Sequence, residues 1–110
     1  MTKIYKILPR TEWQAAKAVG TFTGSGIDLR DGYIHFSTAS QAQETARLHF
    51  RGKTDLVVLE IDATALALTW EPSRGGALFP HLYAHLPVTA VTAVIDAPLD
   101  GDGVPSFTLT

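Results

Sequence analysis

The chain has 110 residues, of which 45% are hydrophobic and 18% charged, with a formal net charge of −2 and no cysteine. This length and composition predict one globular domain spanning residues 1–110. The charge provides no basic field for nucleic acid or an anionic membrane, and no apolar run is long enough to span a bilayer. Without cysteine, disulfides and thiolate chemistry are excluded. We therefore expect a cytoplasmic protein with no membrane or nucleic-acid partner, and its oligomeric state is left open.

The N-terminal third predicts a strand, a helix and a connector, in that order. Residues 3–8 are rich in β-forming residues and precede a proline, which predicts a strand. Thr11 and Gln14 have the spacing of a capping box, and the apolar periodicity after them predicts a helix over residues 12–19. Residues 21–32 contain three glycines and predict a turn-rich connector.

The middle of the chain changes again from strand to helix. Residues 33–36 predict a short strand, because they are β-forming and follow a turn signal. Thr38 and Gln41 repeat the capping-box spacing. The apolar positions after them recur at helical intervals, so we expect a second helix over residues 39–51.

The second half of the chain predicts mainly strands. Residues 56–62 (LVVLEID) are nearly all apolar, as in a central strand that is covered on both faces. Shorter strands are expected at residues 66–70 and 88–95, followed by a turn and a final edge strand. Strands segregated from two helices indicate the α+β class.

The stretch IHFST, residues 34–38, is the first candidate for chemistry. A helix N-terminus offers free backbone N–H groups and partial positive charge, which favour a phosphate or carboxylate. Ser37 and Thr38 add hydroxyl groups there, and His35 shares a strand face with Ser37. The alternative is structural, with Ser37 and Thr38 capping the helix and His35 hydrogen-bonded to backbone.

The stretch WEPSRGGALFPHLY, residues 70–83, is the second candidate. Its glycine pair allows a turn whose backbone N–H groups face one point, and Arg74 supplies a planar donor for an anion. Arg74 and Gly75 are therefore expected to bind a ligand. In the alternative interpretation, Glu71 pairs with Arg74 in a solvated salt bridge that contributes about 1 kcal/mol or less.

Histidines and aromatic residues complete this second stretch. His81 suits a general acid or base, or an anchor of the loop, because histidine titrates near neutrality. His81 and His85 have the i, i+4 spacing of metal ligands, but without a glutamate partner we expect no metal site. A cis peptide bond is possible before Pro80. Trp70 is expected to be a core residue, as is Trp13.

Three successive blocks of the chain resemble the bacterial domain-of-unknown-function family 952. They are IYKILPRTEWQAAKAVGTFTGSGIDLRDGYIHFSTASQ, LVVLEID and WEPSRGGALFPHLY, and the resemblance extends over residues 4–91. It implies a small α+β domain with a mostly antiparallel split sheet, similar to the ADP-ribosyltransferase fold. Proteins of that fold bind NAD or related phosphorylated ligands in a cleft of the sheet, so NAD is a possible cofactor.

The resemblance also suggests roles for a few positions. Residues 32–50 resemble the strand-then-helix block of ADP-ribosyltransferases, in which small hydroxyl residues precede the helix, and Ser37 and Thr38 match those positions. Tyr5 and Lys6 stand where these enzymes place a first-strand histidine or arginine that contacts the ribose. The position of a catalytic glutamate is not defined.

Taken together, these features predict a cleft for a small anionic or nucleotide-like ligand. Its walls are expected to be formed by His35, Ser37 and Thr38 on one side, and by Trp70, Glu71, Arg74, Gly75, His81 and Tyr83 on the other.

In the leading hypothesis this cleft belongs to an enzyme. Arg74 and the two hydroxyl residues hold the anion, either histidine transfers a proton, Glu71 orients a ribose hydroxyl, and the aromatic residues Tyr83 and Trp70 pack against a ring. Two alternatives stay open: a binding or sensing module without turnover, and an interaction domain in which residues 70–83 are only a rigid loop.

Overall fold

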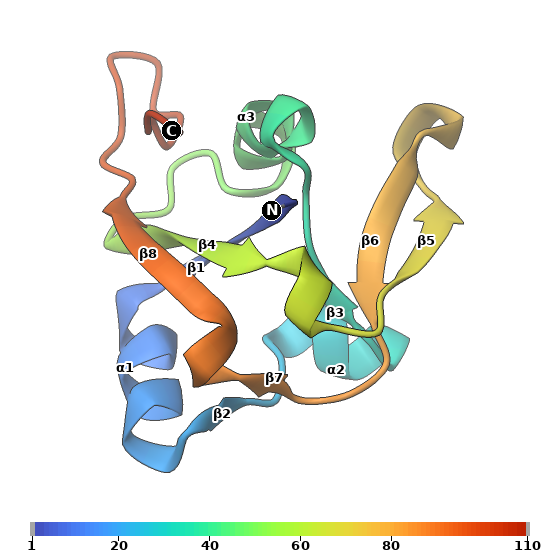
Figure 1. The fold of residues 1–110 in the computed structure, drawn as a ribbon. Coiled ribbons are helices and arrows are strands. Elements are labelled where there is room, and N and C mark those ends of the chain that lie inside the picture. Colours follow the sequence, from blue (N-terminus) through green and yellow to red (C-terminus); the bar gives the residue numbers. More distant parts are fainter. Residues whose placement is uncertain (1, 110) are drawn as a thin grey trace.

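The computed structural model describes residues 2–109, and its central layer is an antiparallel sheet of three strands (Figure 1). The strands are β1 (Lys3–Pro9), β4 (Leu56–Asp62) and β8 (Val91–Asp96), in the order β1-β4-β8. All residues of β4 except the last are buried. This burial confirms the prediction of a central strand that is covered on both faces. A continuous apolar run suits such a strand because neither face meets water.

The remaining strands form a second three-stranded sheet and a two-stranded pair. The second sheet has the order β3-β6-β5, and the pair is β2-β7; both are antiparallel. Their bounds are β2 (Thr21–Phe22), β3 (Ile34–His35), β5 (Thr69–Pro72), β6 (Leu78–Leu82) and β7 (Leu86–Pro87).

The two larger sheets meet at a single isolated bridge among the described residues. The backbone N–H groups of Tyr5 and Ser37 each donate to the carbonyl oxygen of the other residue, at 2.8 Å. Tyr5 belongs to β1 of one sheet, and Ser37 follows β3 of the other sheet by two residues. The space between these strands is occupied by side chains of a short helix, described below.

Residues 2–109 contain three α-helices, where two were predicted. They are α1 (Arg10–Val19), α2 (Gly26–Asp31) and α3 (Ala39–His49), and short 3-10 turns occupy Ala63–Ala65, Arg74–Gly76 and Val88–Ala90. None of the helices among residues 2–109 is long and apolar enough to cross a membrane.

The helix starts correct one prediction and confirm another. α1 begins at Arg10, two residues earlier than a cap at Thr11 allows, and its N-cap is Pro9, so the first predicted capping box is wrong. Proline suits this position because it lacks the N–H that would otherwise need a partner. The second capping box is confirmed: the backbone N–H of Thr38 donates to Gln41 Oε1 at 3.0 Å.

Helix α2 lies inside the segment that was predicted to be a connector. Ser25 caps it in a capping box with Asp28, and the backbone N–H of Ser25 donates to Asp28 Oδ2 at 2.9 Å. Gly32 ends the helix at a φ of 86°, which glycine adopts without strain. The glycines that suggested a loop therefore serve as the two ends of a helix.

Two groups of buried side chains pack on the two faces of the central sheet. One contains Leu8, Trp13, Phe22, Leu59 and Leu86, with α1 against the sheet; the other contains Tyr5, Ile7, Ala42, Ala46 and Val58, under α3. Figure 1 shows α1 and α3 on opposite sides of the strands. The burial of Trp13 is confirmed.

The stretch from residue 70 to residue 83 is a β-hairpin rather than an irregular loop. β5 and β6 pair from Thr69 opposite His81 to Pro72 opposite Leu78, and the hairpin projects from the domain (Figure 1). No cis peptide bond occurs within the part of the chain that the structure describes. Trp70 is 43% exposed, so its prediction as a core residue is wrong, because β5 lies at the edge of its sheet.

The boundaries of the later strands also differ from the prediction. The strand expected at residues 66–70 lies at 69–72, and the one expected at 88–95 is a 3-10 turn followed by β8. The tail forms an isolated bridge between Leu99 and Pro105 in place of an edge strand.

Candidate functional site

Two histidines lie side by side on one face of the β3-β6-β5 sheet. His35 is directly opposite His81 in the antiparallel register, and Ile34 is opposite Leu82. Because side chains alternate along a strand, Ile34 and Leu82 enter the core while the histidines share the opposite face. Tyr33 and Tyr83 flank the two strands on that same face. We call Tyr33, His35, Glu71, His81 and Tyr83 the histidine face.

The aromatic rings of the histidine face are in mutual contact. Tyr33 stacks on His81 with ring centroids 4.2 Å apart and an interplanar angle of 28°. It also lies 4.6 Å from the His35 ring and 5.0 Å from the Tyr83 ring, while the two imidazoles meet edge to face at 5.3 Å. These separations are within the range of favourable aromatic pairs. Tyr33 is therefore the central ring of the group.

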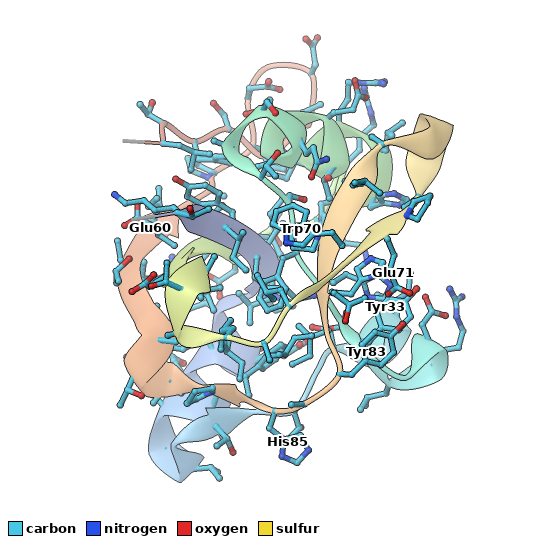
Figure 2. The ribbon with its side chains drawn as sticks, turned by 45° about the vertical axis from the view of Figure 1, so that its right-hand side comes forward. Tyr33, Glu60, Trp70, Glu71, Tyr83 and His85 are labelled. Carbon is cyan, nitrogen blue, oxygen red and sulfur yellow. The ribbon has the colours of Figure 1, made fainter. Side chains whose placement is uncertain are left out.

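Glu71 connects His81 with Tyr83 from the neighbouring strand. Its Oε1 is 2.8 Å from His81 Nδ1 and accepts a hydrogen bond from the Tyr83 hydroxyl at 2.7 Å. Figure 2 shows Glu71, Tyr33 and Tyr83 gathered together, with Trp70 directed away from them. Hydrogen bonds from Tyr83 and His81 lower the pKa of Glu71, and the bond to this carboxylate raises the pKa of Tyr83 to about 12. At neutral pH Glu71 is thus an anion and Tyr83 a donor.

His35 is held between two carboxylates of helix α2. Its Nδ1 is 2.6 Å from Asp28 Oδ1, and its Nε2 is 3.0 Å from Asp31 Oδ2. Both contacts are hydrogen bonds only when the ring carries two protons, since a neutral imidazole has one N–H. The backbone N–H of His35 also donates to Asp28 Oδ1, at 3.1 Å. His35 therefore fastens α2 to β3.

Asp28 is the buried center of this network, with an exposure of 2%. Its carboxylate lies 2.9 Å from the ammonium group of Lys6, which comes from β1 and is 6% exposed. Burial alone raises the pKa of Asp28, but hydrogen bonding from His35 and the charge of Lys6 outweigh it and hold the pKa at about 2. Burial lowers the pKa of Lys6, and the nearby Asp28 carboxylate offsets part of that effect. Asp28 thereby joins β1, α2 and β3 where the two sheets separate.

The pKa of Asp28 predicts a loss of stability in acid. The pKa in the folded state is below the ordinary value of 3.8, so the unfolded chain takes up the proton first as the pH falls. The contribution, about 2 kcal/mol, is present above roughly pH 4 and is lost as the pH falls to about 2. Urea unfolding measured across this range is expected to show this slope, and Asp28→Asn is expected to reduce it. Equal slopes for the two proteins would show that other carboxylates cause the acid sensitivity.

A hollow of about 260 Å³ adjoins the histidine face. It is lined by both tyrosines and by neighbouring residues of α2 and of the turn after β6, including Asp28, Leu29, Ala84 and His85. A larger hollow of about 420 Å³ lies between α1 and residues 21–26, but neither a histidine nor a tyrosine lines it. We therefore place the candidate site at the smaller hollow and the histidine face.

The structure brings four of the predicted site residues together and separates others from them. His35, Glu71, His81 and Tyr83 are in one connected group. Trp70 precedes Glu71 in β5 and so has the opposite orientation. His85 lines the hollow but does not belong to the group that Glu71 connects (Figure 2), and among the residues that the structure describes no cluster has the composition of a metal site.

The predicted anion-binding residues lie toward the other end of the hairpin. Ser37 Oγ is 3.0 Å from Thr45 Oγ1, Thr38 belongs to the capping box of α3, and both hydroxyl groups have partners within the helix. The backbone of Arg74 and Gly75 forms the hairpin tip, beyond the start of β6 at Leu78, which is itself three residues or roughly 10 Å along the strand from His81. The side chain of Arg74 is outside the described part of the chain, so its predicted pairing with Glu71 stays a prediction.

Three residues of the site were missed by the sequence-based predictions: Asp28, Asp31 and Tyr33. The signal for Tyr33 is a pattern, because YIHFS and FPHLY both place aromatic residues two positions from a histidine. In two antiparallel strands with the histidines paired, such residues share one face. The signal for Asp28 is Ser25, three residues before it, which has the spacing of a capping box. Asp31 lies on the helix that this capping box begins, in the segment that was predicted to be a connector.

Comparison with known proteins identifies relatives of this chain. Residues 7–94 match the sequence model of a family described as protein of unknown function, DUF952. The crystal structure of protein CC0527 from Caulobacter crescentus is 58% identical, covers 96% of this chain and 94% of that chain, and has a TM-score of 0.93. The solution NMR structure of CC0527 is similar as well, with 58% identity, coverage of 96% and 93%, and a TM-score of 0.86. No protein with curated annotation matches. The chain therefore belongs to the DUF952 family.

Proposed function

We propose that the histidine face binds a small nucleotide-like molecule and that His81 transfers a proton to or from it. The observation that carries this proposal is the shared Glu71 Oε1, which lies within hydrogen-bond distance of both His81 Nδ1 and the Tyr83 hydroxyl. A carboxylate that orients an imidazole in this way is a recurring arrangement in acid–base catalysis.

The roles follow from the protonation states of the three groups. When Nδ1 of His81 donates to Glu71, the neutral ring carries its lone pair on Nε2, which is then the basic atom. Nε2 has no hydrogen-bond partner among the residues that the structure describes. A hydroxyl group of the ligand, or a water, could give its proton to Nε2 while Glu71 stabilises the imidazolium. The corresponding reaction class is hydrolysis or group transfer: the deprotonated oxygen forms the new bond, the bond to the leaving group breaks, and the imidazolium returns its proton to that group, while Tyr83 keeps its hydrogen bond to Glu71.

NAD and transfer of ADP-ribose form the narrower version of this proposal. The separation of β1 from β3 supports it, since a split sheet is the feature that the sequence resemblance implies for an NAD cleft. Lys6 weighs against it, because the residue at the first-strand position is buried against Asp28 and does not reach a ligand.

A binding or sensing module without turnover is the second candidate. It is favoured by the low accessibility of the two imidazole rings. His81 is 4% exposed beneath Tyr33, and both ring nitrogens of His35 contact carboxylates. In this version the same residues recognise the ligand, and no proton leaves it.

The test is a panel of nucleosides, nucleotides, NAD and sugar phosphates, screened by thermal shift and followed by chromatography of each ligand that binds. His81→Gln is expected to lower the turnover of a converted ligand by about a hundredfold or more, the usual contribution of a general base. Glu71→Gln is expected to reduce turnover in the same direction, because the orienting charge is lost. His49→Gln is the matched control, since His49 is exposed on α3.

The outcomes separate the two candidates. Conversion that depends on His81 supports the enzyme. A ligand that binds in a manner dependent on His81, and is recovered unaltered after long incubation, supports the sensing module. A panel without any binder, or binding that is indifferent to both His81 and Glu71, contradicts the proposed function in both versions.

A further inference from the structure

We infer that the hollow beside Tyr33 and Tyr83 is the seat of a planar ring, and that the site selects an uncharged nucleoside over its phosphorylated form. This inference rests on the proposed function and names the chemical class of its ligand. It departs from the expectation of an anionic ligand, and three observations lead to it: the size of the hollow, its aromatic walls, and the charges around it.

The size of the hollow limits the ligand to one ring system. Its volume of about 260 Å³ is below the range of about 300–1,000 Å³ that is usual for drug-sized ligands. A dinucleotide such as NAD would therefore leave most of its atoms outside. A single heteroaromatic ring fits; Glu71 and His81 lie outside the lining of the hollow, so a substituent on the ring would have to extend past Tyr83 to reach Glu71.

The walls of the hollow favour a ring by their own chemistry. Tyr33 and Tyr83 line it together with the apolar residues Leu29, Ile34 and Leu82. The tyrosine rings are 5.0 Å apart, too close to admit a third ring between them. A bound ring would instead pack against the outside of this pair. Stacking on such a surface is sequence-tolerant and typically contributes about 1–3 kcal/mol per base in nucleic-acid complexes, which is ample for a recognisable preference.

The charges around the rings disfavour a phosphate. Asp28, Asp31 and Glu71 border the rings, and the pKa of each is below its ordinary value, so all three are anions at neutral pH. Of the described cations beside them, Lys6 is buried in its pair with Asp28, and Arg30 is paired with Asp31 at the surface. These pairs leave Glu71 as the carboxylate without a described lysine or arginine partner, so the described charges around the rings sum to a net negative charge that disfavours a phosphate.

The donors that the sequence suggested for a phosphate already have hydrogen-bond partners within the protein. The Ser37 hydroxyl is in contact with Thr45, and the N-terminus of α3 is closed by the capping box of Thr38 and Gln41. A substituent with uncharged hydroxyl groups suits Glu71 and His81 better than a phosphate does, because Glu71 accepts hydrogen bonds and His81 accepts or donates one. The polar side of the site therefore matches a sugar better than a phosphate.

The experiment compares adenosine with adenosine 5′-monophosphate, which differ only in the phosphate, by isothermal titration calorimetry. Adenosine is expected to bind about tenfold more tightly at low ionic strength, the factor that a repulsion of about 1.4 kcal/mol produces. Salt should reduce the difference by screening. Asp31→Asn is expected to narrow it by strengthening the binding of the monophosphate, while Asp102→Asn, an exposed carboxylate in the C-terminal turn, should leave it unchanged.

The ring seat is tested by two variants at one position. Tyr33→Leu is expected to weaken adenosine about tenfold, and Tyr33→Phe, which keeps the ring, should bind like the wild type. Because Tyr33→Phe also reports whether the position tolerates change, loss of binding in Tyr33→Leu alone is assigned to the ring.

Failure of this inference is distinct from failure of the proposed function. A monophosphate that binds as tightly as adenosine or more tightly overturns the inference, yet is consistent with a nucleotide-like ligand. Adenosine affinity that is unchanged in Tyr33→Leu overturns the ring seat. If no member of the larger ligand panel binds, both the proposed function and this inference are contradicted.

Discussion

Asp28→Asn is expected to lower the free energy of unfolding by about 3–5 kcal/mol, one of the two largest effects that we anticipate. The substitution keeps the size of the side chain but removes the negative charge beside Lys6, whose ammonium group is 2.9 Å away and buried. A buried cation without its counter-ion keeps the full cost of leaving water. Urea unfolding followed by circular dichroism measures the change.

Two further variants identify the cause of that loss. Lys6→Met in the Asp28→Asn background removes the unpaired charge and is expected to recover a large part of the stability. Asp31→Asn changes a more exposed carboxylate of the same helix and is expected to cost about 1 kcal/mol or less. If the single Asp28→Asn variant is as stable as Asp31→Asn, the ion pair does not hold α2 in place.

Leu59→Ala is expected to destabilise the domain by about 2–5 kcal/mol, because it leaves a cavity in the most tightly enclosed strand. Leu59 is fully buried in the middle of β4, with β1 and β8 on either side. The same shortening at Leu48, which is 45% exposed on α3, is expected to change the stability by about 0.5 kcal/mol. The difference between the two variants in thermal or urea unfolding measures the contribution of the core.

A small effect at Leu59 would contradict the assignment of β4 as the enclosed center of the sheet. The measurement is informative for the candidate site as well, because β4 supports β1, and β1 carries Lys6. If the ligand panel yields a binder and the Leu59→Ala variant still binds it at low temperature, the core at Leu59 contributes to stability and not directly to the proposed site.

The parts of the fold that the sequence predicts are those in which one local signal decides the structure. β4 was predicted over its full length, because a run of apolar β-branched residues has no stable alternative in water. The start of α3 followed from Thr38 and Gln41, whose side chains act within one turn. Helix α2 was missed because the three glycines of residues 21–32 suggested a turn-rich connector, whereas this short helix is held by its capping box and by contacts with Lys6 and His35.

The candidate site was predicted only in part for a related reason. His35 and His81 were each singled out, but their direct pairing depends on the register of two strands separated by more than forty residues of chain. Glu71 was expected either to line the cleft or to pair with Arg74, and its described partners come from the opposite strand of the hairpin. Residue type indicates which side chains can react, while register determines which of them meet.

The single bridge between Tyr5 and Ser37 has a consequence for variation among relatives of this chain. Backbone hydrogen bonds join the two larger sheets at this bridge and at no other described bridge. The relative placement of the sheets therefore depends on the side chains packed between them, with Asp28 at their center. We therefore expect a substitution on β1, well away from either imidazole, to shift one sheet against the other and so change where the histidine face points. Relatives of this chain could therefore differ in function through substitutions between the two sheets, even where the histidines and Glu71 are unchanged.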